Sequence, residues 1–350
     1  MTYKSDKGSL QFERCKAASG AKILREKQLR AARYDSRMLL TLAVAMDLTS
    51  DRIDLDGDGA RRIVLIAGDE EYRSEEMLPQ LASILEKRHG FKCDVLHSIA
   101  QDGTIDPTVT TNEPRLDLLD RANLVIIMTR FRCWPDAQMA RFVKYVESKK
   151  PIIGIRTATH AFAYPKDSPS PFAKFSWDST VWPGGFGKQI LGETWVAHHG
   201  THMVESTRAV PAPGAEQDPI LRGVKDLWVP TDVYASNPME SETLMLGQVL
   251  DGMEPGSKTV GGTKNSPMIP VAWKKETDGR RVFTTTMGSA VDFLNQGFRR
   301  LLVNACFWCL NKPVPRRANV SFVGNYEPSP IGFGKHKKGA FPTSSGGRPR

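Results

Sequence analysis

The chain of 350 residues contains no long hydrophobic run. A membrane-spanning helix needs about 20 consecutive apolar residues, so we expect no membrane partner. One ambiguous segment, residues 38–46 (MLLTLAVAM), resembles the short apolar part of a signal peptide but lies inside the chain. We expect a cytoplasmic location, with an exported or periplasmic protein as the alternative if translation starts at Met38.

Cysteine is also scarce. The five cysteines lie at positions 15, 93, 133, 306 and 309, and an odd, scattered set does not form a disulfide framework. Cys306 and Cys309 have CxxC spacing, but they lie in an apolar helical run without a second CxxC or a suitable histidine pair. We interpret them as core residues of a helix.

Positive charge is concentrated at the two ends of the chain. The formal net charge is +9, of which residues 1–37 carry +6 and residues 311–350 carry +7, leaving −4 on residues 38–310. A mildly acidic globular part without a recognisable nucleic-acid-binding motif argues against a nucleic-acid partner. The sequence leaves open whether the chain forms a homo-oligomer.

Composition divides the chain into three parts. Residues 1–60 form a partly disordered extension, residues 61–311 a globular domain, and residues 312–350 a basic tail rich in proline and glycine that we expect to be mostly mobile. The acidic residues 51–58 faintly resemble a calcium loop. The glutamate required at its twelfth position is absent, so we interpret them as a linker.

Strand and helix patterns alternate through the first half of the globular part. Continuous apolar runs at 62–68, 124–128 and 151–155 are typical of strands buried on both faces, and amphipathic helical patterns lie between them. This alternation predicts an α/β fold with a parallel sheet covered by helices on both faces. Residues 269–276 and 281–286 predict an additional β-hairpin.

Polar residues gather where the predicted parallel strands end. Ligands bind outside the carboxyl ends of such strands. Neither GxGxxG nor GxxxxGK(S/T) follows the first strand, which argues against dinucleotide and P-loop sites. The loops after Gly68, Met128 and residue 156 instead contain the candidate binding residues Glu71, Tyr72, Arg73, Arg130, Arg156 and Thr157.

The turn after the fourth strand is where many α/β enzymes place a nucleophile. Residues 154–162 read GIRTATHAF and contain neither cysteine nor serine, so thiolate chemistry is absent there. Four of the seven histidines lie in residues 151–202, and we expect acid–base chemistry from them. Successive strand residues face opposite ways, so His198 and His199 cannot both address one site unless the chain turns, which Gly200 would allow.

A metal site is the alternative use of these side chains. Such a site needs about three converging ligands, and the candidates are His160, His199, His202 and Glu193. We expect no cofactor, with a divalent metal as the alternative. The loop of residues 163–190 is rich in aromatic residues, and Trp182 and Trp195 either stack on sugar rings or pack a lid.

The ordered motifs resemble the ThuA-like (trehalose utilisation) family of the class I glutamine amidotransferase-like superfamily. The resemblance rests on residues 63–68, 69–76, 154–162, 192–200, 218–224 and 281–288, with an Ile-Gly-Phe-Gly tail at 331–334. It implies a flavodoxin-like fold without amidotransferase chemistry and a link to sugars, including keto-disaccharides. Two departures matter: many relatives carry histidine where this chain has Arg156 and Asp218.

The resemblance and the residues together predict an acid–base enzyme acting on a small-molecule carbohydrate. We expect His160 and His199 to transfer protons and Glu193 to orient them or act as base. The expected substrate-binding residues are Glu71, Tyr72, Arg73, Arg130, Arg156, Thr157, Trp182, Trp195, His198 and His202. Two alternatives remain: a non-catalytic sugar-binding or regulatory module, and a metal-dependent hydrolase or lyase.

Overall fold

A computed structural model describes residues 61–342. The predicted extension at 1–60, with its signal-like and calcium-like segments, lies outside the described residues. Within residues 61–342 no helix is both long enough and apolar enough to cross a membrane.

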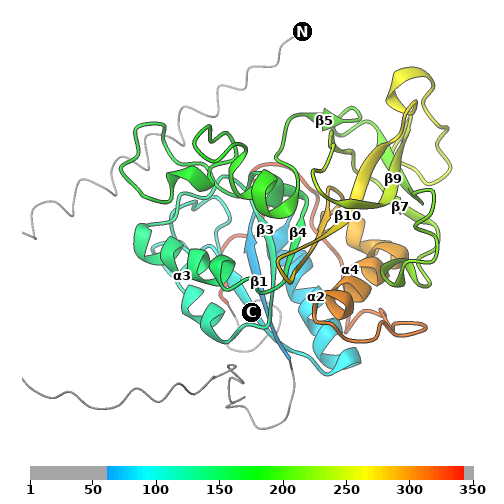
Figure 1. Cartoon of the computed structure of the whole chain (residues 1–350). Coiled ribbons are helices and arrows are strands. Elements are labelled where there is room, and N and C mark those ends of the chain that lie inside the picture. Colours follow the sequence, from blue (N-terminus) through cyan, green and yellow to red (C-terminus); the bar gives the residue numbers. More distant parts are fainter. Residues whose placement is uncertain (1–60, 343–350) are drawn as a thin grey trace, which may run out of the picture. The chain divides into compact units, whose positions relative to one another are not determined.

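A nine-stranded sheet forms the centre of the described domain (Figure 1). One half is parallel, as predicted, and the other half is antiparallel. The parallel strands, in spatial order, are β2 (Lys92–His97), β1 (Arg62–Gly68), β3 (Leu124–Thr129), β4 (Ile152–Ile155) and β11 (Arg280–Thr285). The antiparallel strands follow as β10 (Ile269–Thr277), β9 (Glu242–Leu250), β6 (Ser206–Pro211) and β7 (Leu227–Val229).

Helices cover both faces of the sheet because the parallel strands are apolar on both sides. Along β1, Ile63 and Leu65 pack into one core with α2 (Ser74–His89) and α4 (Gln296–Cys309). Val64 and Ile66 pack into a second core with α3 (Asp136–Glu147) and the 3-10 helix η2 (Leu116–Arg121). Figure 1 shows α3 on one side of the sheet and α2 with α4 on the other. The predicted three-layer α/β fold is confirmed.

The predicted hairpin is confirmed and joins the two halves of the sheet. β10 and β11 pair in antiparallel register up to Thr277 and Arg280. Asp278 and Gly279 both have positive φ, 52° and 78°, as a tight two-residue turn requires. Because β11 also pairs in parallel with β4, the hairpin belongs to the main sheet instead of forming a separate insertion.

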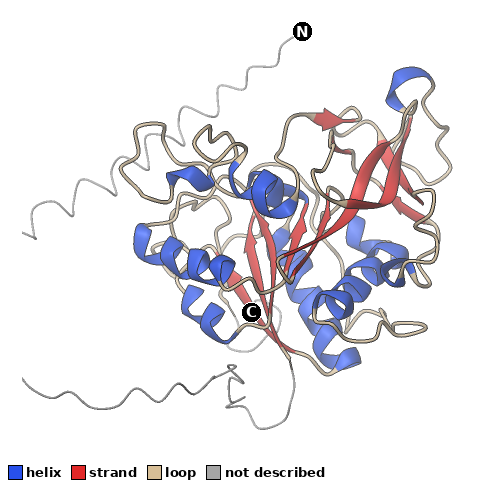
Figure 2. Cartoon of the chain, in the orientation of Figure 1, coloured by secondary structure: helices blue, strands red, loops and turns tan. Residues whose placement is uncertain are grey.

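Short elements build the region between β4 and β6, which is mostly loop (Figure 2). Residues 163–190 pack inward through Phe175 and Phe186, which are 4% and 0% exposed, so this predicted lid is part of the second core. The short elements of the domain are η3 (Arg156–His160), η4 (Ala173–Phe175), η5 (Gly187–Leu191), β5 (His198–His199), η6 (Pro219–Leu221), β8 (Val233–Tyr234), η7 (Gly262–Lys264) and η8 (Asp292–Leu294).

The C-terminal segment, residues 313–342, packs against the domain, which corrects the expectation of a mostly mobile tail. Ala318 and Val320 are buried in the first core, and the Arg299 guanidinium donates to the Val320 carbonyl. Further along, Gly332 exchanges hydrogen bonds with the β1–α2 loop. Basic composition therefore did not indicate mobility here. The two buried, free cysteines Cys306 and Cys309 lie in α4, as the sequence predicts.

Candidate functional site

Arg156 occupies the turn after β4, the position where related folds place a nucleophile. Its φ is +45°, a left-handed conformation that side chains other than glycine rarely adopt. The side chain is fully buried. Behind the turn, Gly288 leaves the necessary space, because a Cβ there would lie 2.3 Å from Ile155 Cγ2. The strained elbow is thus present, with a guanidinium in place of a thiol.

The Arg156 guanidinium holds Asp232 and lies between two tyrosine rings. Nη1 donates to the Asp232 carbonyl at 2.7 Å and to Thr231 Oγ1 at 3.1 Å, and Nη2 lies 3.4 Å from Asp232 Oδ1. The guanidinium carbon is 3.8 Å from the Tyr72 ring centroid and 5.0 Å from that of Tyr234. Arg156 therefore acts as a buried support and does not reach a ligand directly.

Asp232 links two histidines. His198 Nδ1 lies 2.5 Å from Asp232 Oδ2, and His202 Nδ1 lies 2.9 Å from Oδ1. The carboxylate is 1% exposed, whereas the two imidazoles are 35% and 31% exposed. Burial alone would raise the pKa of Asp232, but hydrogen bonds from both histidines hold it well below its usual range. Asp232 is thus an ionised, rigid orienter.

His202 bridges two carboxylates. Besides the contact with Asp232, its Nε2 lies 3.2 Å from Glu71 Oε1. Hydrogen bonds to Asp232 and Glu71 raise the pKa of His202 to about 9, so both ring nitrogens carry protons at neutral pH. His202 is therefore a fixed cation and a poor proton acceptor.

His198 has the arrangement of a proton-transfer group. Its Nδ1 is turned toward Asp232, which fixes the tautomer with the proton on Nδ1 and leaves Nε2 as the acceptor. The ring lies 6.1 Å from Trp195 and 5.4 Å from Tyr234, edge to face in both cases. A partly exposed imidazole oriented by a buried carboxylate is the pairing used in acid–base catalysis.

Aromatic residues form a wall beside this pair. The rings of Trp177 and Trp195 lie 5.6 Å apart, and Phe131 lies 5.8 Å from Trp177. His160 packs among them, 5.0 Å from Phe131 and 5.6 Å from Trp195. Burial lowers the pKa of His160 well below its ordinary value, so it is neutral at physiological pH. Its Nδ1 is 3.2 Å from Thr159 Oγ1.

Three of the residues expected to act on substrate lie outside this group. His199 faces the other way on β5, and its Nε2 contacts the Lys264 carbonyl at 2.9 Å. Glu193 accepts hydrogen bonds from two backbone amides, those of Thr194 at 3.0 Å and Asn237 at 2.8 Å. Trp182 packs on Phe175 with ring centroids 5.0 Å apart. The alternation argument for His198 and His199 is confirmed, with His198 facing the cluster.

The expected binding residues of the other two loops support the site from below. Arg73 is fully buried and donates to the Glu70 carbonyl at 2.5 Å and the Gly332 carbonyl at 2.7 Å. Arg130 is 19% exposed, pairs with Glu70 and lies 3.8 Å from Glu71. Thr157 is fully buried beside the elbow, and Tyr72 lies beneath Arg156. Of these residues, Arg130 is the one with an accessible charge.

The sequence did not single out Asp232 or Tyr234. Both lie on or next to β8, a two-residue strand that pairs with β5. No motif marks this strand, and its only signal is that buried Arg156 requires a carboxylate partner. Gly200, with φ +103°, supplies the predicted turn that returns His202 toward Asp232.

The metal candidates predicted from sequence do not converge. Within residues 61–342, one group places three ligand atoms within 4.8 Å of one another, and it comprises His198, His202 and Asp232. His202 alone is shared with the predicted set of His160, His199, His202 and Glu193.

Comparison with known proteins decides the family. The ThuA (trehalose utilisation) family matches residues 64–309. The chain belongs to the ThuA family. That description connects this ThuA protein with carbohydrate metabolism at the level of the family.

Solved structures show the same fold. A ThuA-like protein from Parabacteroides merdae has a TM-score of 0.50 at 16% identity, covering 73% of this chain and 92% of that one. A ThuA-like protein from Bacteroides uniformis has a TM-score of 0.43 at 15% identity, covering 71% and 91%. No curated protein matches the sequence significantly.

The two departures from the family pattern lie in different places. Arg156 is at the elbow, whereas Asp218 caps η6 by accepting from Ile220 N at 2.8 Å. Asp218 also pairs with Lys274 of β10. Only the first departure touches the histidine cluster.

Proposed function

We propose that this ThuA protein processes a carbohydrate of the trehalose or keto-disaccharide type, with His198 and Asp232 as the proton-transfer pair. The observation that carries the proposal is the 2.5 Å contact between His198 Nδ1 and a buried, ionised Asp232 carboxylate. The proposal moves proton transfer from the expected His160, His199 and Glu193 to the pair that the geometry brings together.

In this scheme His198 Nε2 accepts a proton from a sugar hydroxyl or from a carbon next to a keto group. Asp232 stabilises the imidazolium that forms, and His198 then returns the proton to the departing oxygen. The His202 cation and Arg130 stabilise negative charge that develops on the sugar oxygen. Neutral His160 donates or accepts a hydrogen bond, and Trp195 packs on an apolar sugar face.

Adjacent histidines provide a matched test. His198→Gln should lower kcat on a glycoside or ketoglycoside substrate by about 10²–10⁴-fold. His199→Gln, whose imidazole contacts Lys264, should remain close to wild type. Wild-type activity in His198→Gln would reject the proton-transfer role. Binding without turnover across a broad panel, with affinity unchanged in His198→Gln, would instead indicate a sugar-binding or regulatory module.

A second candidate is a metal-dependent hydrolase or lyase. The observation that favours it is the convergence of His198, His202 and Asp232, since three protein ligands and a water suit a catalytic zinc site. Metal binding would require His202 to give up the proton that Asp232 and Glu71 stabilise. Elemental analysis of purified protein decides the matter, because a fully active metal-free preparation would end this candidate.

A further inference from the structure

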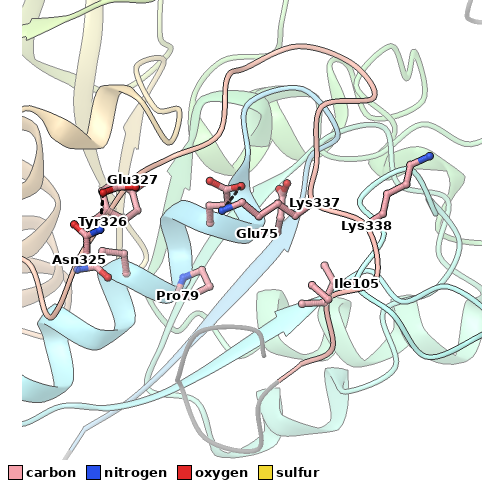
Figure 3. A pocket seen from close by; sticks show the side chains of 12 residues that line it. Glu75, Pro79, Ile105, Asn325, Tyr326, Glu327, Lys337 and Lys338 are labelled. Atoms are coloured by element: carbon pink, nitrogen blue, oxygen red, sulfur yellow. Dashed lines mark hydrogen bonds and ion pairs between the residues drawn. The ribbon is translucent and has the colours of Figure 1, made fainter.

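A cavity lies away from the histidine cluster, between α2 and the C-terminal segment (Figure 3). Its volume is about 360 Å³. The wall formed by α2 contributes Glu75, Glu76, Pro79 and Gln80, and residues 325–340 form the opposite wall. Ile105 adds an apolar patch, so the cavity combines acceptors with a partly apolar lining.

Most of the polar groups that line the cavity already have partners. Glu76 Oε2 accepts from the Ser329 amide at 2.7 Å, and its Oε1 lies 3.8 Å from Lys337 Nζ. Glu327 Oε1 accepts from Asn325 Nδ2 at 2.6 Å. These groups are satisfied without a ligand.

Glu75 is the exception. Its residue is 7% exposed, and both carboxyl oxygens are buried without a hydrogen-bond partner. The nearest cation is Arg73, whose Nη1 lies 3.5 Å from Glu75 Oε1. A buried carboxyl without donors is costly, so a donor arriving from the cavity would be stabilised there.

We propose that this cavity binds a small organic ammonium ion, an alkylamine or an amino sugar, whose ammonium group contacts the Glu75 carboxylate. The apolar body of the ligand would lie against Pro79 and Ile105. A metal ion fits less well, because only Glu75 offers unpaired carboxyl oxygens. Figure 3 shows Lys338 pointing away from Glu75, so its ammonium does not fill the site.

The charges around Glu75 predict how this binding depends on pH. Burial raises the pKa of Glu75 to about 8, with Asp69 and Glu76 adding to the rise and Arg73 opposing it. Across the cavity, Lys337 and the Tyr326 hydroxyl come from the C-terminal segment. Because an ammonium ion favours the ionised carboxylate, affinity should increase from about pH 6 to about pH 8, with release of a proton on binding.

Matched ligands test the proposal on the wild-type chain by titration calorimetry. One arm compares butylamine with 1-butanol, and the other compares glucosamine with N-acetylglucosamine. Both ammonium compounds should bind and the neutral partners should not, and the tighter arm identifies the natural class. Measurements in buffers of different ionisation enthalpy should show the released proton. Equal binding by the neutral partners, or no binding by either amine, would overturn the proposal.

Two variants localise the binding. Glu75→Gln should weaken it at least about tenfold, whereas Glu327→Gln, at an exposed and already paired position of the same cavity, should leave it unchanged. His198→Gln should also leave it unchanged, which separates this site from the proposed proton transfer. Undiminished ammonium binding by Glu75→Gln would refute the assignment. If that variant does not fold, the ligand pairs and the proton release still decide the question.

Discussion

Arg156 grips Asp232 at two points, donating to its carbonyl at 2.7 Å and approaching Oδ1 at 3.4 Å. This contact connects the end of β4 to the strand β8, 76 residues away in sequence. In a fold whose elbow elsewhere holds a reactive thiol, the elbow here orients the carboxylate that orients His198. The buried cation also balances Asp292, which accepts from Thr231 at 2.9 and 2.8 Å.

The first prediction concerns this buried charge. Arg156→Gln should destabilise the protein by about 3–5 kcal/mol, because Asp232 and Asp292 lose their buried counter-charge. Arg141→Gln is the control, since Arg141 is 48% exposed in its pair with Asp120 and should matter by less than about 0.5 kcal/mol. Chemical denaturation measures both. Equal stability of the two variants would show that Arg156 does not support the elbow.

The second prediction tests the space behind the elbow. Gly288→Ala should cost about 3 kcal/mol, because φ is +138° and the added Cβ would lie 2.3 Å from Ile155 Cγ2. Gly279→Ala in the hairpin turn should cost about 1 kcal/mol, since φ is +78° but nothing lies within 4 Å. Thermal unfolding compares them. Reversal of this order would contradict the packing described for the elbow.

The sequence predicted the fold better than the site, for a physical reason. Strands, helices and the β10–β11 turn depend on local periodicity and glycine positions, which are visible in a few residues. Strand alternation even showed that only one of His198 and His199 could face a given site. Choosing between them required Asp232, whose position depends on pairing between β5 and β8. The contact of Gly332 with Arg73 and Glu71 is likewise long-range, so composition alone suggested a mobile tail.

The third prediction concerns the charge on His202. Hydrogen bonds to Asp232 and Glu71 raise its pKa in the folded protein to about 9, above the ordinary value of 6.5. The protonated form therefore stabilises the fold fully below about pH 6.5, and this contribution is lost as the pH rises through about 9. The difference in unfolding free energy between wild type and His202→Gln should shrink over that window.

His199→Gln is the control for this titration. Burial lowers the pKa of His199, so its removal should not alter the pH dependence between about pH 6.5 and 9. Urea denaturation at several pH values gives the curves. A pH-independent difference between wild type and His202→Gln would show that His202 is not held between two ionised carboxylates.

The last prediction concerns the rim of the site, where the C-terminal segment meets Arg130. The Arg130 guanidinium lies between two aromatic rings, 4.5 Å from Phe131 and 5.1 Å from Phe333. A double-mutant cycle of Phe333→Leu with Arg130→Gln should give a coupling of about 0.5–1 kcal/mol. The same cycle with Phe341→Leu, another exposed phenylalanine of the segment, should give none. Zero coupling for Phe333 would mean that the segment covers the β1–α2 loop without positioning the accessible cation of the site.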